Sequence, residues 1–242
     1  MKRAKAPSDT LFSAAQRRAP VSEQGVPLAD RMRPRTLSEV AGQRHLIGAG
    51  KPLAQAIAAD RVTSMILWGP PGCGKTTLAQ VIAASTRARY VPYSAVLGSV
   101  PELRAILAEA GEARSFRGER TLLFLDEIHR FNKSQQDALL PDVERGGVVL
   151  VGATTENPSF AINAALLSRC RVFSLKAIED ADIVELLRRA LTDRRGLASL
   201  AIQAEEDALE GLAKLASGDA RRALGLLESA VIFATGANPA GS

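Results

Sequence analysis

A glycine-rich loop between an apolar run and a helical pattern constrains the fold of this chain more than any other feature. The run Met65–Trp68 predicts a short buried strand, and the following residues 69–76 fit the pattern G-x-x-x-x-G-K-[ST]. Residues 78–84 then predict a helix. Because strand, glycine loop and helix follow in this order, the stretch predicts a phosphate-binding loop rather than a glycine-rich turn with a chance lysine.

The residue types of this loop suit a bound triphosphate. Glycines let the backbone turn tightly and point its N–H groups at phosphate oxygens, and the helix start adds the positive end of its dipole. Lys75 supplies a mobile cation, and Thr76 offers a hydroxyl to Mg²⁺, which prefers oxygen ligands. The loop residues predicted to hold ATP are Gly69, Pro70, Pro71, Gly72, Cys73, Gly74, Lys75, Thr76 and Thr77.

A second apolar run ends in two adjacent acids. Residues 121–125 predict a strand buried on both faces, followed by Asp126 and Glu127. Ligands gather at the carboxyl ends of such strands, so Asp126 is predicted to hold Mg²⁺. Glu127 is predicted to orient and deprotonate the water that attacks the γ-phosphate. The alternative, two exposed acids at a strand end, is disfavoured by the phosphate loop upstream. For His129, a packing or capping role is favoured over a catalytic one.

Composition bounds the class of protein. The 242 residues suggest one or two domains, and a hydrophobic content of 46% supports a real core. The net charge of +5 permits a nucleic-acid partner without requiring one. The two cysteines form no C-x-x-C pair, which argues against a zinc site or a disulfide framework. Because the apolar runs are too short to span a bilayer, we expect a cytoplasmic protein with no membrane partner.

The order of predicted elements gives an α/β fold class, a parallel sheet flanked by helices and followed by a small all-α lid domain. The predicted boundaries are 1–25 for a disordered tail, 26–175 for the nucleotide-binding core, 176–235 for the lid and 236–242 for a C-terminal tail. Strands are predicted at 65–68, 90–93, 121–125, 148–153 and 171–174. Helices are predicted at 51–59, 78–84, 102–114, 132–143, 161–167, 180–191, 205–215 and 219–233.

Further motifs between residues 28 and 234 resemble those of the AAA+ ATPases, in their clamp-loader branch. Residues 31–34 with 42–43 look like the N-terminal box that cups the adenine. The resemblance therefore implies that Arg31, Pro34 and Gln43 contact ATP.

The same resemblance assigns polar residues to catalysis. Thr155 is placed like the sensor 1 residue that positions the attacking water, and Arg221 like the sensor 2 arginine that faces the phosphates. Arg169, in the sequence Ser-Arg-Cys, looks like an arginine finger that reaches the ATP site of a neighbouring subunit. With Lys75 and Glu127, these residues form the predicted catalytic set.

Three segments, 64–72, 129–137 and 152–160, look like the family of replication-associated recombination protein A, bacterial relatives of the Werner-helicase-interacting protein. The resemblance implies a DNA-stimulated, Mg²⁺-dependent ATPase at stalled forks, gaps and duplex ends. It implies roles in DNA replication, recombination and repair, contact with single-strand binding protein, and a nucleoid-associated location.

Members of that family continue past the lid into an oligomerisation domain, whereas this chain stops at Ser242. The resemblance therefore implies a fragment or a truncated member. The full-length family forms homo-oligomers, and this chain alone is expected to be a monomer that hydrolyses ATP poorly.

Three alternatives stay open at this point. A clamp-loader subunit or a Holliday-junction branch-migration motor shares most of these motifs. A non-catalytic adaptor would use ATP binding alone as a switch. A DNA-binding module without nucleotide dependence is a third class, and the scattered basic residues do not locate a DNA surface.

Overall fold

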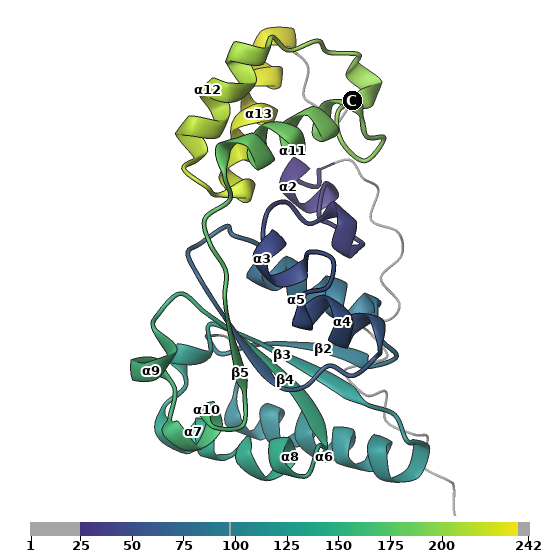
Figure 1. Ribbon diagram of the computed structural model, residues 1–242, viewed down its shortest axis with the longest axis vertical. Helices are drawn as coiled ribbons and strands as arrows, with labels where there is room; N and C mark the ends of the chain where they lie inside the picture. Colours follow the sequence, from purple (N-terminus) through teal and green to yellow (C-terminus); the bar gives the residue numbers. More distant parts are fainter. Residues whose placement is uncertain (1–24, 97, 237–242) are drawn as a thin grey trace, which may run out of the picture.

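The computed structural model describes residues 25–96 and 98–236 (Figure 1). Except for Gly25 and Gly236, the tails predicted at 1–25 and 236–242 lie outside the described residues. None of the helices in the described part of the chain combines the length and the hydropathy that crossing a bilayer requires.

In the described part of the chain, five parallel strands form one sheet in the order β2-β3-β4-β1-β5. Their bounds are β1 Met65–Trp68, β2 Arg89–Ser94, β3 Thr121–Asp126, β4 Val148–Thr154 and β5 Arg171–Ser174. Strands β2 to β4 lie on one side of β1 and β5 lies on the other. Because the order reverses at β1, a crevice opens beyond the carboxyl ends of the strands there.

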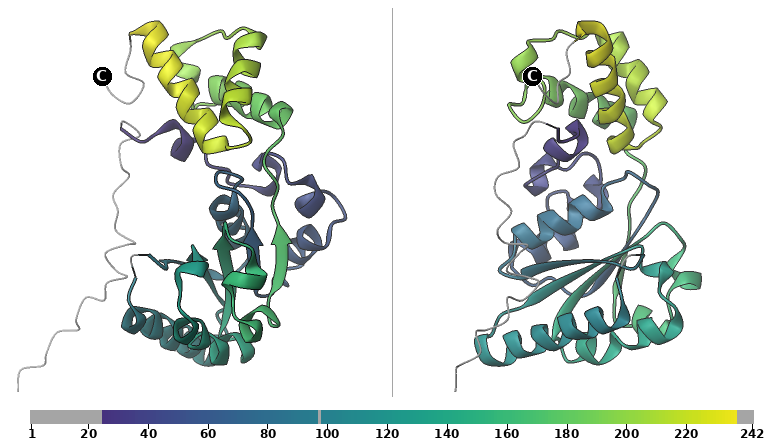
Figure 2. Two further views of the ribbon diagram at one scale, coloured as in Figure 1. Left: turned by 90° about the vertical axis from the view of Figure 1, so that its left-hand side faces the viewer. Right: turned by 180° about the vertical axis from the view of Figure 1, so that it is seen from behind.

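Helices cover both faces of the sheet, as Figures 1 and 2 show. On one face lie η2 (Ile128–Arg130), α6 (Val100–Arg117), α7 (Lys133–Asp137), α8 (Leu140–Glu144) and α10 (Ala164–Leu167); on the other lie α4 (Pro52–Ala58) and α5 (Lys75–Ala84). Side chains of β3 alternate between the faces: Leu123 packs with α6, whereas Leu122 and Phe124 pack with α4 and α5. The central strands are thus buried on both sides, as parallel sheets require.

A separate helical layer forms the lid. It contains α11 (Asp180–Thr192), η3 (Ala198–Leu200), α12 (Glu206–Ala216) and α13 (Ala220–Thr235). The short N-terminal helix α2 (Leu28–Arg31) joins this layer, because Leu28 and Met32 are fully buried in its apolar core. Between α2 and α4 the chain forms η1 (Leu37–Glu39) and α3 (Arg44–Ile47). The fold class predicted from the sequence is therefore confirmed, and the N-terminal segment packs with a domain more than 140 positions away in the chain.

Two predicted helices are wrong as single elements. The helix expected from 132 to 143 is two, α7 and α8, because Pro141 lacks the N–H that would continue the first helix. Its predicted start is confirmed: Asn132 accepts a hydrogen bond from the N–H of Gln135, whose side chain accepts one in return. The helix expected at 161–167 is also two, α9 (Pro158–Ala161) and α10, and Asn163 caps the second through the N–H of Leu166.

Candidate functional site

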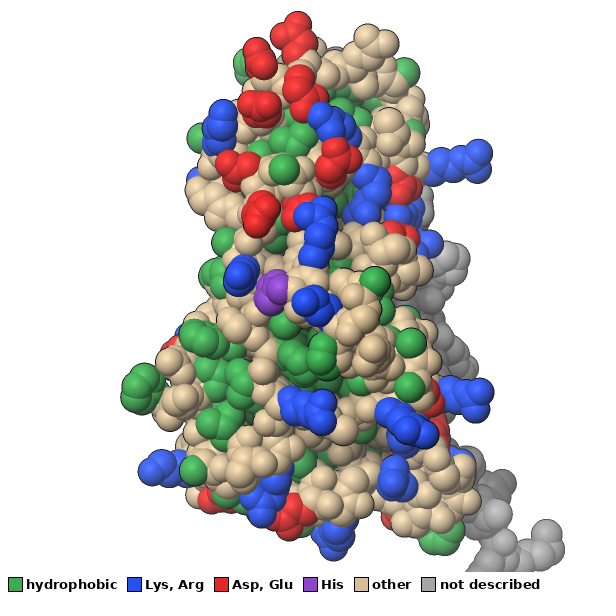
Figure 3. Space-filling model, viewed as in Figure 1, with side chains coloured by type: hydrophobic (Ala, Val, Ile, Leu, Met, Phe, Trp, Pro, Cys, Tyr) green, Lys and Arg blue, Asp and Glu red, His purple; other side chains and the backbone are tan. Residues whose placement is uncertain are grey.

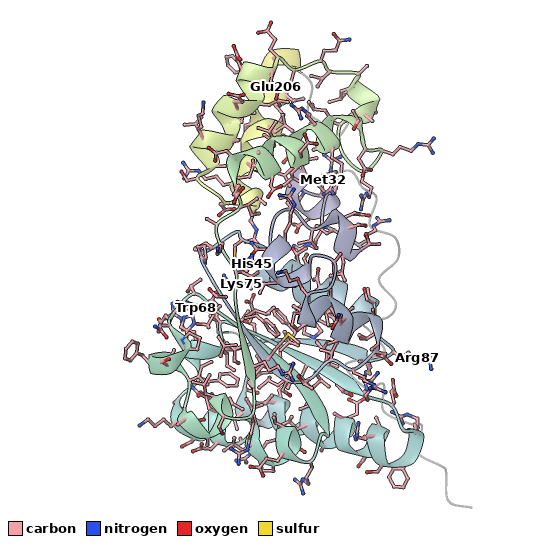
Figure 4. All side chains as sticks on the ribbon, in the orientation of Figure 1. Met32, His45, Trp68, Lys75, Arg87 and Glu206 are labelled. Carbon is pink, nitrogen blue, oxygen red and sulfur yellow. The ribbon has the colours of Figure 1, made fainter. Side chains whose placement is uncertain are left out.

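A cavity of about 410 Å³ lies between the sheet, the N-terminal segment and the lid. Its polar part is lined by Pro71, Gly72, Cys73, Gly74, Lys75, Thr76, Thr77, Asp126, Glu127, Thr155 and Arg221. The rest is lined mainly by apolar or small side chains, Ala29, Met32, Pro34, Val40, Ala41, Ile178, Leu186, Ala220 and Leu224, together with Arg33. Figure 4 shows Lys75 on the sheet side and Met32 on the lid side. The fold thus brings most of the predicted site residues to one place.

The phosphate loop has the backbone that the glycine pattern predicts. Gly72 and Gly74 adopt φ values of +66° and +99°, which side-chain-bearing residues avoid, and Gly74 stands directly before α5. Lys75 is 8% exposed, and its Nζ donates to the carbonyl oxygens of Gly69 and Pro70 at 2.8 Å each. Burial raises the pKa of the Cys73 thiol, so this side chain adds no negative charge to the loop. The loop therefore offers backbone N–H groups and a cation to an anion.

The lid contacts the phosphate loop directly. The N–H of Ala220 donates to the carbonyl oxygen of Gly72 at 3.2 Å. Asp219, which caps α13 through the N–H of Arg222, lies so close that a Cβ on Gly72 would come within 1.9 Å of its carboxyl group. A side chain at position 72 would therefore force the lid away from the phosphate loop.

Gly72→Ala is expected to lower the free energy of unfolding by about 2–3 kcal/mol. The positive φ costs about 1–2 kcal/mol for a residue with a Cβ, and displacing the Asp219 cap costs about 1 kcal/mol more. Thermal or urea unfolding measures the loss. Gly118→Ala is the matched control, because Gly118 has nearly the same φ of +64° but an added Cβ would meet nothing within 4 Å. Equal losses for the two variants would contradict the close contact with Asp219.

The two acids lie at the end of β3, and both line the cavity. Asp126 ends the strand, and Glu127 has a left-handed backbone (φ +55°, ψ +45°) before η2. This conformation is uncommon for a residue with a side chain, and such strain concentrates at functional sites. The Glu127 carboxylate oxygen Oε2 lies 3.2 Å from Nε2 of His129. The Glu127 carboxylate thus lies beside both the predicted phosphate site and the imidazole of His129.

A magnesium ion bound with a nucleotide fits the donors that are present. Thr76 and Asp126 line the same cavity, and both offer the oxygen atoms that Mg²⁺ prefers. In the described part of the chain no group of three His, Cys, Asp or Glu side chains could hold a metal alone. Mg²⁺ commonly takes one or two protein ligands and completes its shell with water and phosphate oxygens, so two ligands suffice.

Two further predicted residues line the cavity from opposite sides. Thr155 follows β4, and its exposed side chain approaches from the sheet. Arg221 lies in the first turn of α13 and approaches from the lid. Among the described residues, no side chain or carbonyl pairs with the Arg221 guanidinium, so it can turn toward a bound anion.

Five predicted residues lie outside the cavity lining: Arg31, Gln43, Gly69, Pro70 and Arg169. Nη1 of Arg31 donates to the carbonyl oxygens of Arg195 and Gly196 at 3.1 and 2.7 Å, so Arg31 ties α2 to the lid. Gln43 is 5% exposed, and its amide donates to the carbonyl oxygens of Cys73 and Lys176. These contacts hold the backbone segments next to the cavity together. Direct contact of Arg31 and Gln43 with ATP stays a prediction.

Arg169 lies on the surface away from the cavity. Its guanidinium Nη2 is 2.5 Å from the carboxylate Oε1 of Glu144, and Nη1 donates to the carbonyl oxygen of Ala165. The side chain is 37% exposed. In this position Arg169 does not line the cavity of its own chain.

The apolar lining of the cavity and the contact of Asp219 with the loop were not predicted from the sequence. Leu186 and Leu224 follow the ordinary helix-core pattern, so nothing in the sequence marked them as cavity residues. A signal for Asp219 did exist, since an aspartate directly before a helical pattern predicts an N-cap.

Comparison with known proteins agrees with this geometry. The model of AAA, the ATPase family associated with various cellular activities, matches residues 65–176. A solved structure of the RuvB Holliday junction branch migration motor of Thermotoga maritima superimposes with a TM-score of 0.68 and 30% identity, over 86% of this chain and 68% of that one. The chain belongs to the AAA family of ATPases.

Several of its relatives carry the name replication-associated recombination protein A. Replication-associated recombination protein A of Escherichia coli K12 is 52% identical over 203 residues, which are 84% of this chain and 45% of the relative. The protein named ATPase WRNIP1 of Dictyostelium discoideum is 43% identical over 85% of this chain and 23% of its own length. The chain thus spans about half the length of the bacterial relatives, or less. The family predicted from the sequence is confirmed.

Proposed function

We propose that this chain binds ATP with Mg²⁺ in the cavity and hydrolyses it in a DNA-stimulated cycle that serves replication-fork maintenance, recombination and repair. One observation carries the proposal. A phosphate loop with a buried lysine, two carboxylates, a strand-end threonine and a lid arginine line the same cavity. Binding and hydrolysis of a triphosphate accounts for all of these groups together, because each of them can act on a triphosphate.

Lys75 exchanges the carbonyl oxygens of Gly69 and Pro70 for the outer phosphates of ATP. Within the described residues its Nζ contacts two carbonyl oxygens and no carboxylate, so this exchange breaks no ion pair there. The backbone N–H groups at the start of α5 hold the inner phosphates. The apolar end of the cavity, beside Met32, Pro34 and Ile178, takes the flat adenine ring.

Glu127 takes the proton of the attacking water, and the Thr155 hydroxyl orients that water from the neighbouring strand end. Arg221 neutralises charge that spreads over the transferred phosphoryl oxygens. Thr76 and Asp126 hold Mg²⁺, which supplies further charge neutralisation at the phosphates when it is bound. Since Arg221 lies on the lid and the loop on the core, the bound nucleotide sets the angle between them.

Arg169 acts on the ATP of a neighbouring copy. Its place on the surface, outside the cavity of its own chain, supports this role. To act, it must leave Glu144, and a phosphate of higher charge is a stronger partner than a half-exposed carboxylate. Hydrolysis is therefore expected to need contact between copies of the chain in a homo-oligomer, and to be slow where the copies are apart.

DNA is the proposed partner of the core rather than of the lid. In the view of Figure 3, acidic side chains gather over the lid helices at the top, whereas Lys and Arg side chains predominate over the middle. Phosphate backbones are attracted by the second distribution and repelled by the first. Forks, gaps and duplex ends are the proposed DNA structures, single-strand binding protein is the proposed protein partner, and the nucleoid within the cytoplasm is the proposed location.

Hydrolysis of ATP at rising protein concentration, with and without forked DNA, tests the proposal. Forked DNA is expected to raise the rate per chain by about tenfold, equivalent to about 1.4 kcal/mol in the barrier. Arg169→Ala is expected to remove most of the increase with concentration, because that increase reports contact between copies. Arg145→Ala, a change at an exposed arginine outside the cavity lining, is the control. Rates that stay near zero under all conditions, with ATP bound, would contradict hydrolysis.

That last outcome is the one expected of a second candidate, an adaptor switched by ATP binding alone. The position of Arg169 favours the adaptor, because Arg169 lies outside the cavity of its own chain and an isolated chain has no second copy to supply this arginine. Similarity to the branch migration motor supports a third candidate, a motor at Holliday junctions. Comparison of forked DNA with four-way junctions, as activators of the same hydrolysis, separates it from the first.

A further inference from the structure

His129 is buried where the proposed catalytic residues meet. It lies on η2, two residues after Glu127, and its side chain is 4% exposed. Nδ1 of the imidazole is 3.0 Å from the Thr154 hydroxyl, and Nε2 is 3.2 Å from Oε2 of Glu127. The carboxylate of Glu156 lies 3.6 Å from the same Nε2. One buried ring thus joins the acid after β3 to the end of β4.

The two ring nitrogens face different partners. Nε2 faces oxygens of two carboxylates, which only accept hydrogen bonds when ionised. A hydrogen on Nε2 is favoured there, because a lone pair would be repelled by both carboxylates. The Thr154 hydroxyl can donate to Nδ1 or accept from it. The ring therefore contacts the carboxylates through one nitrogen and the end of β4 through the other.

The main chain of Glu127 is fixed, so its carboxylate can move only by rotation about the side-chain bonds. Its φ of +55° is an uncommon value, and the N–H of Arg130 donates to its carbonyl oxygen at 2.8 Å. The main chain is therefore fixed by the turn of η2, and the position of the carboxylate depends on its side-chain torsions. The contact of the carboxylate with His129 restricts these torsions.

Thr154 connects the same ring to the residue expected to orient water. Its buried hydroxyl accepts a hydrogen bond from the N–H of Glu156 at 3.0 Å and lies 3.3 Å from the Glu156 carbonyl oxygen. These contacts close a tight turn around Thr155, which lines the cavity. A displacement of the ring would thus disturb the carboxylate and the threonine together.

We propose that His129 is a positioning residue, which holds the Glu127 carboxylate and the Thr155 turn in the relative arrangement that hydrolysis requires. The proposal rests on the proposed function, because it needs Glu127 to act as the base. Contacts between catalytic groups are often loosely aligned before substrate binds and tighten in the reactive complex. The 3.2 Å contact of Nε2 with Glu127 is such a contact.

Three substitutions separate positioning from packing. His129→Ala removes both nitrogens, His129→Asn keeps a polar group near the position of Nδ1, and His129→Gln keeps a donor near the position of Nε2. In single-turnover hydrolysis with forked DNA, we expect the alanine and asparagine variants to lose about tenfold to hundredfold in rate. The glutamine variant is expected to recover most of the rate. Binding of ATP, measured with a fluorescent analogue, is expected to change less than about threefold in all three, since the ring does not line the cavity.

The chain provides a matched control in its other histidine. His45 is exposed and contacts the carbonyl oxygen of Ser174, far from Glu127 in the sequence. His45→Ala is expected to leave the rate unchanged. If the rate falls equally in the alanine and glutamine variants of His129, and in proportion to their thermal stability, the ring has a packing role and the proposal is overturned.

A double-mutant cycle tests whether His129 acts through Glu127. In a Glu127→Gln background, His129→Ala is expected to cost less than about threefold, because the carboxylate it positions is gone. Fully additive losses would overturn the positioning role while leaving the proposed function intact. A Glu127→Gln variant that hydrolyses ATP at the normal rate would instead remove Glu127 as the base, and with it both proposals.

Discussion

Lys75→Ala is expected to lower the rate of ATP hydrolysis by at least about hundredfold, which corresponds to about 2.7 kcal/mol in the barrier. The buried ammonium group is the cation of the phosphate loop, and its two carbonyl partners show that it already lies within the loop. Removal of a preorganised positive group from a site of developing negative charge typically costs this much or more. Affinity for ATP is expected to fall as well, since the same charge faces the ground-state triphosphate.

Steady-state hydrolysis and titration with a fluorescent ATP analogue measure the two effects of this substitution. Lys133→Ala is the control, because Lys133 is exposed on α7 and lies outside the cavity lining. Unchanged affinity and rate in Lys75→Ala would show that the loop does not bind the phosphates. A normal melting temperature for the variant is needed to exclude a loss of fold.

Glu127→Gln is expected to lower hydrolysis by about 10²–10⁴-fold while ATP still binds. Glutamine has nearly the same shape and keeps the contact with the neighbouring imidazole, but it cannot take a proton from water. Loss of rate without loss of binding is the signature of a group that acts only in the transition state. The variant should therefore accumulate a bound, unhydrolysed nucleotide.

Single-turnover kinetics with excess protein separate the chemical step from binding in this variant. Glu112→Gln on the exposed face of α6 is the matched control. Equal rates for the two variants would contradict a base at position 127. A rate that falls only because ATP no longer binds would assign Glu127 to nucleotide binding instead.

Much of the fold could be predicted because strand and helix patterns are local. Strands β1 and β5 have the predicted bounds, and the three lid helices lie within two residues of theirs at each end. The two broken helices could not be placed as well, because Pro141 and Asn163 act at the ends of elements, where periodicity is weakest.

The candidate site was predictable to the extent that it depends on motifs. The phosphate loop, the two acids, Thr155 and Arg221 line one cavity, as their spacing and resemblance implied. Arg31 and Gln43 were predicted from the same box, yet they bond to backbone groups behind the cavity. A motif defines which residues gather in a region, whereas the direction of each side chain depends on partners far away in the chain.

The amino-acid sequence by itself determined the parallel sheet, the phosphate loop and the acids beside it. Apolar periodicity and glycine backbone freedom act over a few residues, so they can be recognised without tertiary contacts. Only the tertiary structure decided that the N-terminal helix joins the lid, that Asp219 rests on Gly72, and that His129 joins two strand ends. Each of these depends on the packing of distant segments, whose positions no local pattern records.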